Sequence, residues 1–89
     1  MTDSEKAAKV VGDLKAAERK PAPVALKILN GLTGLVQGGG DQPLEVEDAR
    51  SSAFLAICEV GKALHRGQPA DRLWQSAIDA AERWMSLSK

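Results

Sequence analysis

The stretch EVEDARSSAFLAICEVGKALHRG, residues 45–67, says most about the fold of this chain. Its middle, from Ser51 to Cys58, carries no charge, and charged residues flank it on both sides. Acidic side chains near the start and basic ones near the end suit the dipole of a helix. Gly67 supplies the left-handed residue that commonly closes a helix. The pattern therefore predicts a helix over residues 44–66.

Apolar side chains lie on two sides of this predicted helix. One side holds Val46, Ala49, Ala53, Ala56, Val60 and Ala63, and the other holds Phe54, Ile57, Cys58, Gly61 and Leu64. A helix that is apolar on two sides must be covered on two sides. We therefore expect it at the centre of a small bundle. The sequence leaves open whether this chain alone covers it or whether a second copy, in a homodimer, completes the cover.

Three further helices are expected, over residues 4–20, 23–37 and 69–87. Asp3 or Ser4 is the candidate N-cap of the first, and Pro21 ends it, because the residue before a proline is pushed away from helical angles. Helical spacing of apolar residues supports all three. The first has one narrow stripe, Ala7, Val10, Val11, Leu14 and Ala17, and the last has a broad face, Ala70, Leu73, Trp74, Ala77, Ile78, Ala81, Trp84 and Met85. Asn30-Gly31 is also a type I′ turn signal, so a hairpin over residues 24–37 is the competing interpretation. Residues 38–43, with three consecutive glycines, are expected to form a flexible linker.

Composition supports a single all-α domain over residues 1–89, a small four-helix bundle with a central apolar helix. The chain has no tyrosine and one phenylalanine, and 44% of its residues are hydrophobic. Twelve basic and twelve acidic side chains give zero formal charge, so no overall field attracts nucleic acid or anionic lipid. No signal peptide or membrane-length apolar run is present, and we expect a cytoplasmic protein.

The residues that could support chemistry are few. Cys58 and His65 share a helix face but lie about 10 Å apart at 1.5 Å per residue, too far for direct contact. A zinc site would need further ligands for His65. The acids Glu45, Glu47 and Asp48 suit a solvated helix start better than a cation site. We therefore expect no catalytic residues, no metal and no cofactor.

Binding to another protein remains as the expected activity. Trp74 and Trp84 are the largest apolar side chains, and tryptophan is enriched at interface hot spots, although a core position is the competing assignment for both. The three acids of residues 45–48 are expected to meet a basic partner surface. Small residues suited to a dimer or to close helix packing are Gly31, Gly34, Ala53, Ala56 and Val60.

The sequence thus predicts a non-catalytic protein-binding module, such as an adaptor or a small inhibitor that occupies a partner's surface. One alternative is a DNA-associated regulator with a helix-turn-helix-like arrangement around Gly67, although Asp71, Asp79 and Glu82 on the outer face of the last helix would repel phosphate. A further alternative is a small metal-dependent protein that uses His65.

Overall fold

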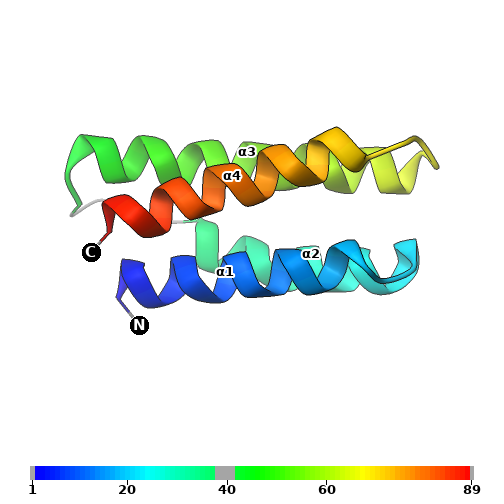
Figure 1. Ribbon diagram of the computed structural model, residues 1–89, viewed down its shortest axis with the longest axis horizontal. Coiled ribbons are helices and arrows are strands. Elements are labelled where there is room, and N and C mark those ends of the chain that lie inside the picture. Colours follow the sequence, from blue (N-terminus) through cyan, green and yellow to red (C-terminus); the bar gives the residue numbers. More distant parts are fainter. Residues whose placement is uncertain (1, 38–41, 89) are drawn as a thin grey trace.

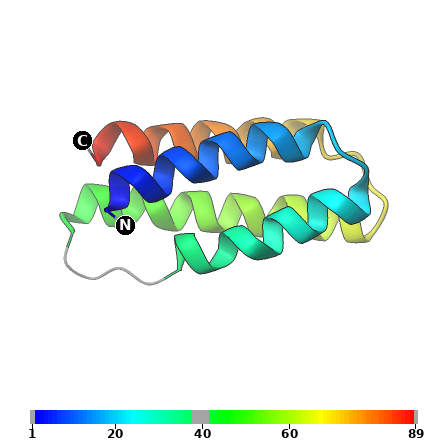
Figure 2. The same cartoon turned by 90° about the horizontal axis from the view of Figure 1, so that it is seen from below.

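A computed structural model describes residues 2–37 and 42–88, and this part of the chain forms four α-helices. They are α1 (Asp3–Glu18), α2 (Ala22–Val36), α3 (Leu44–His65) and α4 (Asp71–Leu87). Successive helices run antiparallel along one elongated bundle (Figures 1 and 2). The predicted all-α four-helix bundle is confirmed. The hairpin alternative is wrong, because residues 24–36 are helical.

Each helix packs against two others, since α1 and α3 both contact α2 and α4. The expectation of a central α3 is therefore wrong, because α3 is one of four walls around a shared core. Its buried residues are Val46, Ala49, Ala53, Ile57, Val60 and Ala63. Its second apolar side meets α2, where Ile57, Cys58 and Gly61 lie beside Leu26 and Leu29. Helix α2 thus covers part of this second side, where Ile57 is buried and Cys58 and Gly61 stay partly accessible.

The core follows the helical periodicity of the sequence closely. The buried residues of α1 are Ala7, Val10, Val11, Leu14 and Ala17, the stripe that spacing alone predicts. The buried residues of α4 are Trp74, Ala77, Ile78, Ala81 and Trp84. Many of these side chains are small, so the two tryptophans supply much of the volume that close packing requires.

The helix ends differ from expectation by a few residues. Thr2 rather than Asp3 or Ser4 caps α1, in a capping box: the backbone N–H of Glu5 donates to Thr2 Oγ1 at 3.2 Å and that of Thr2 donates to Glu5 Oε1 at 3.1 Å. The Thr2 hydrogen bonds lower the pKa of Glu5. At the other end α1 stops at Glu18, two residues earlier than expected. Helix α4 begins at Asp71 instead of Pro69, and Ala70 is its N-cap.

The turn between α3 and α4 closes as the sequence predicts. Gly67 has φ +67°, the only positive value among the described residues. Its backbone N–H donates to the Leu64 carbonyl at 3.2 Å, and the Gln68 N–H donates to the Ala63 carbonyl at 2.9 Å. These two bonds are the Schellman arrangement, which favours glycine because a Cβ is strained at this φ.

Both short turns, between α1 and α2 and between α3 and α4, lie at the same end of the bundle (Figures 1 and 2). The opposite end carries the start of α1 and the end of α4, which are tied together where Trp84 Nε1 donates to Asp3 Oδ2 at 3.3 Å. Among the described residues, none of the helices combines the length and apolarity needed to cross a bilayer.

Candidate functional site

The two tryptophans lie in the core and not on the surface. Trp74 is 4% exposed and Trp84 is 0% exposed. The core assignment therefore describes both rings, and neither can touch a partner unless the helices separate. We therefore propose no partner-binding role for Trp74 or Trp84.

The acids at the start of α3 have different surroundings. Glu47 forms an ion pair with Arg50, and both side chains are largely shielded from solvent. Arg50 also donates from Nη1 to the Val36 carbonyl at 2.6 Å, which fixes the end of α2 against α3. Glu45 and Asp48 are exposed. Contact of these two acids with a basic partner surface stays a prediction, whereas Glu47 serves the fold.

The small residues also separate into two groups. Ala53 and Val60 are fully buried and Ala56 is half-buried, so they contribute to close packing within the chain. Gly31 and Gly34 are exposed, and a Cβ built at either would meet nothing within 4 Å. Close packing of these two glycines against another helix of the described chain therefore does not occur. Their involvement in a dimer remains a prediction.

The structure offers little to metal or nucleophile chemistry. Cys58 is half-buried and His65 is exposed, both on α3. Nowhere in residues 2–37 or 42–88 do three His, Cys, Asp or Glu side chains gather closely enough to hold a metal ion.

The turn at Gly67 does not produce the geometry of a DNA reader. The two helices of a helix-turn-helix cross at roughly 90–120°. In this bundle α3 and α4 run antiparallel and side by side in both views (Figures 1 and 2).

The surface of α2 is different from that of the other helices. Its buried residues are Ala25, Leu29, Leu32 and Val36, and we call all its other residues the α2 face. Lys27 is the one charged residue of α2. By contrast α1, of similar length, carries Asp3, Glu5, Lys6, Lys9, Asp13, Lys15 and Glu18. Because the outer side of a solvated helix is usually charged, the α2 face is unusually poor in charge for a surface helix.

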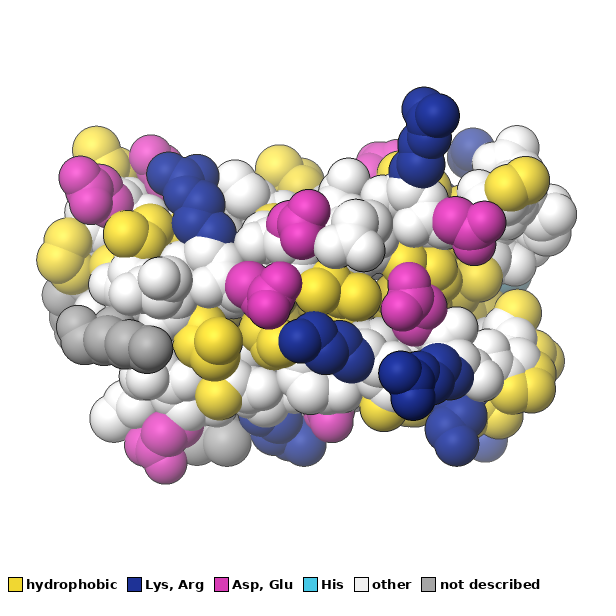
Figure 3. Space-filling view, viewed as in Figure 1, with side chains coloured by type: hydrophobic (Ala, Val, Ile, Leu, Met, Phe, Trp, Pro, Cys, Tyr) yellow, Lys and Arg dark blue, Asp and Glu magenta, His cyan; other side chains and the backbone are white. Residues whose placement is uncertain are grey.

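The side formed by α1, α3 and α4 provides the contrast. Figure 3, which looks onto α1 and α4, shows basic and acidic side chains interspersed among hydrophobic ones. One pair joins α1 to α4, with Lys15 Nζ 3.6 Å from Glu82 Oε2. Such a mixed, paired surface is typical of a face that meets only water. The exposed side chains of Leu44 and Leu55 on α3 are single residues, which are common on protein surfaces.

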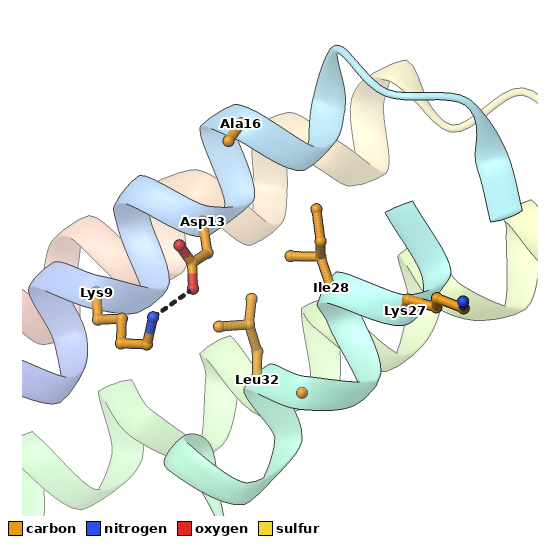
Figure 4. A pocket seen from close by; sticks show the side chains of 7 residues that line it. Lys9, Asp13, Ala16, Lys27, Ile28 and Leu32 are labelled. Carbon is orange, nitrogen blue, oxygen red and sulfur yellow. Dashed lines mark hydrogen bonds and ion pairs between the residues drawn. The ribbon is translucent and has the colours of Figure 1, made fainter. Parts of the chain in front are cut away.

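A groove runs along each flank of α2. The groove toward α1 lies between Ile28 and Leu32 of α2 and Ala16 of α1. Figure 4 shows Ile28 and Leu32 pointing toward α1, whereas Lys27 points away. The rim on α1 is an ion pair, with Lys9 Nζ 3.1 Å from Asp13 Oδ2, so its charges compensate each other.

The second groove, between α2 and α3, has a different rim. We call it the α2–α3 groove, and its α2 wall consists of Leu26, Leu29, Asn30 and Thr33. Its α3 wall consists of Ile57, Cys58, Gly61 and Lys62, and it continues past His65 to Arg66 at the turn end. Leu29 and Ile57 are buried and form its floor. None of the described residues lining this groove is acidic.

Sequence reasoning did not find this groove, because its walls come from segments about thirty positions apart. The available signal was the low charge of residues 22–36. The chain matches no family model, no curated protein and no solved structure.

Proposed function

We propose that this protein is a non-catalytic protein-binding module, an adaptor or small inhibitor that acts by occupying a partner's surface, and that it binds through the α2 face. The observation that carries the proposal is the scarcity of charge on α2, which has Lys27 alone while lying on the outside of the bundle. A helix face with so little charge leaves its partly accessible apolar side chains without a charged surround, and accessible apolar surface of this kind can mark a site of protein–protein contact.

The shape of the α2 face supports the same role. Val24 is 44% exposed, and the half-buried Leu26, Ile28 and Leu35 leave part of their side chains accessible. Gly31 lies between the two grooves with its backbone uncovered. A partner helix can therefore approach the α2 backbone closely and insert apolar side chains on either side, as in helix-in-groove recognition.

The proposal is tested with a pair of glycine variants. In Gly31→Glu a charge is placed in the middle of the α2 face, and in Gly12→Glu the same change is made on the outer side of α1. A Cβ at either position meets nothing within 4 Å, so both variants should fold normally, which circular dichroism checks. We expect affinity purification from the native cell, read by quantitative mass spectrometry, to recover one partner with the wild type and with Gly12→Glu.

Gly31→Glu should lose that partner. Equal recovery with all three baits would contradict binding through the α2 face. If the recovered protein is the chain itself, the partner is a second copy, and the homodimer expected as one alternative from the sequence would be the functional form.

A further inference from the structure

Resting on the proposed function, we infer that the α2–α3 groove takes an amphipathic helix of another protein whose apolar stripe is flanked by acidic side chains. The groove has an apolar interior and a basic end, and these two properties select different parts of the same ligand. Its length and its charge each limit what can occupy it.

The interior fits apolar side chains of a helix. The buried floor is formed by Leu29 and Ile57, and half-buried Leu26 and Cys58 line the walls. From Leu26 to Thr33 the groove spans roughly 10 Å at 1.5 Å per residue. That length is about two helical turns, which matches anchors at positions i, i+3 or i+4, and i+7 of a docked helix.

Gly61 opens the α3 wall of this groove. It stands opposite Leu26 and Asn30, and a Cβ at this position would meet nothing within 4 Å. A larger residue here would fill the groove without disturbing α3. The space above Gly61 is therefore available to a side chain of the partner.

The end near the turns selects for negative charge. Lys62, His65 and Arg66 line it, and no described lining residue is acidic. Lys62 already forms an ion pair with Glu59, whose Oε1 lies 3.5 Å from its Nζ. Both side chains are more than half exposed, so this pair is weak and an acidic side chain of a partner can replace Glu59. Opposed helix ends meet here, the start of α2 and the end of α3, so their partial charges largely cancel. The side chains therefore set the sign of the potential.

The flank toward α1 has a weaker preference of this kind. Its charged lining residues are Lys9, Asp13 and Lys27, and because Lys9 and Asp13 are already paired with each other at 3.1 Å, Lys27 is the cation left there. An acidic helix therefore gains more from the α2–α3 groove than from the groove beside α1. Charge of this kind mainly contributes specificity and a faster association, and the apolar contacts supply most of the affinity.

The test uses two synthetic helical peptides with the full chain. Both peptides carry leucine at i, i+3, i+4 and i+7; one has glutamates beside the leucine stripe, and the other has lysines in their place. Amide shifts in ¹⁵N-labelled protein locate the binding. We expect the acidic peptide to shift Asn30 and Gly61, to bind at least about tenfold more tightly than the basic one, and to weaken as salt rises.

Two variants with matched controls fix the site. Gly61→Leu should weaken the acidic peptide about tenfold by filling the groove, whereas Gly12→Leu, the same change on α1, should not. Arg66→Glu should also weaken binding, whereas Arg83→Glu, on the exposed side of α4, should not. The inference is overturned if both peptides bind alike, if the shifts map to α1 or α4, or if the control variants lose as much affinity.

Two other outcomes would also decide against the inference. If random duplex DNA displaces the acidic peptide, and if Arg66→Glu abolishes that DNA binding, the basic end of the groove binds phosphate and not a protein. If the natural partner binds Gly61→Leu as it binds the wild type but does not bind Gly31→Glu, the α2 face is the binding surface and the groove assignment alone is wrong.

Discussion

Replacing a helical glycine by alanine is expected to stabilise this protein at four positions. Gly12, Gly31, Gly34 and Gly61 lie inside helices, and a Cβ at each would meet nothing within 4 Å. Alanine restricts the unfolded chain more than glycine does, and it is favoured in a helix interior by about 0.5–1 kcal/mol. For a domain of this size each change should raise the Tm by roughly 2–8 °C.

Gly67 provides the opposite control. Its φ of +67° is the left-handed conformation, which costs a residue with a Cβ about 1–2 kcal/mol. Gly67→Ala should therefore lower the Tm, while the four helical variants raise it. Thermal unfolding followed by circular dichroism measures all five proteins under the same conditions.

The informative results are those at Gly31 and Gly34. A fall in Tm for either alanine variant would refute the reasoning, because it would mean that a backbone packs against α2 where the described structure has open space. If the fall also depended on protein concentration, that backbone would belong to a second copy of the chain. A rise in Tm together with weaker partner binding would show that these glycines serve recognition at the expense of stability.

Three other predictions concern contacts that hold the bundle together. Arg50→Met removes both the hydrogen bond to the Val36 carbonyl and the ion pair with Glu47, and should lower the unfolding free energy in urea by about 1.5–3 kcal/mol; an unchanged midpoint would show that these two contacts are dispensable. Trp84→Ala should lower the free energy of unfolding by about 3–5 kcal/mol, since the side chain is fully buried. A loss below about 1 kcal/mol would contradict the buried position of the ring. The lowered pKa of Glu5 means that its capping contribution is present above the ordinary glutamate pKa and is lost as the pH falls through the lowered value. Protection of the amides at the start of α1, measured relative to the intrinsic exchange rate at each pH, should therefore fall in acid more in the wild type than in Thr2→Ala, and an equal fall would contradict the capping role.

The local part of the fold was predictable from the sequence. The stripe from Ala7 to Ala17 and the broad face of α4 are the buried residues in the structure, because helical periodicity depends only on neighbouring positions. Gly67 likewise closes α3 as expected, since the Schellman turn is also local. Helix ends were less predictable, and α4 begins at Asp71, two residues after Pro69, because a proline does not by itself fix where a helix begins.

The tertiary part was not predictable. Two apolar sides on α3 suggested a central helix, but α3 is one of four walls, with α4 packed on one side and α2 partly covering the other. The charge balance of the chain, zero overall, concealed the basic end of the α2–α3 groove, which arises only when Lys62 and Arg66 are placed beside Leu26. The expected linker at residues 38–43 lies mostly outside the described residues, and its flexibility stays a prediction.

The most direct test of the central claim is hydrogen exchange of the protein in complex with its purified partner, read by mass spectrometry. If the α2 face is the binding surface, amides of residues 24–36 become protected on binding, while those on the outer side of α4 exchange as in the free protein. Protection confined to α4, or to the start of α3 around Glu45 and Asp48, would contradict the claim.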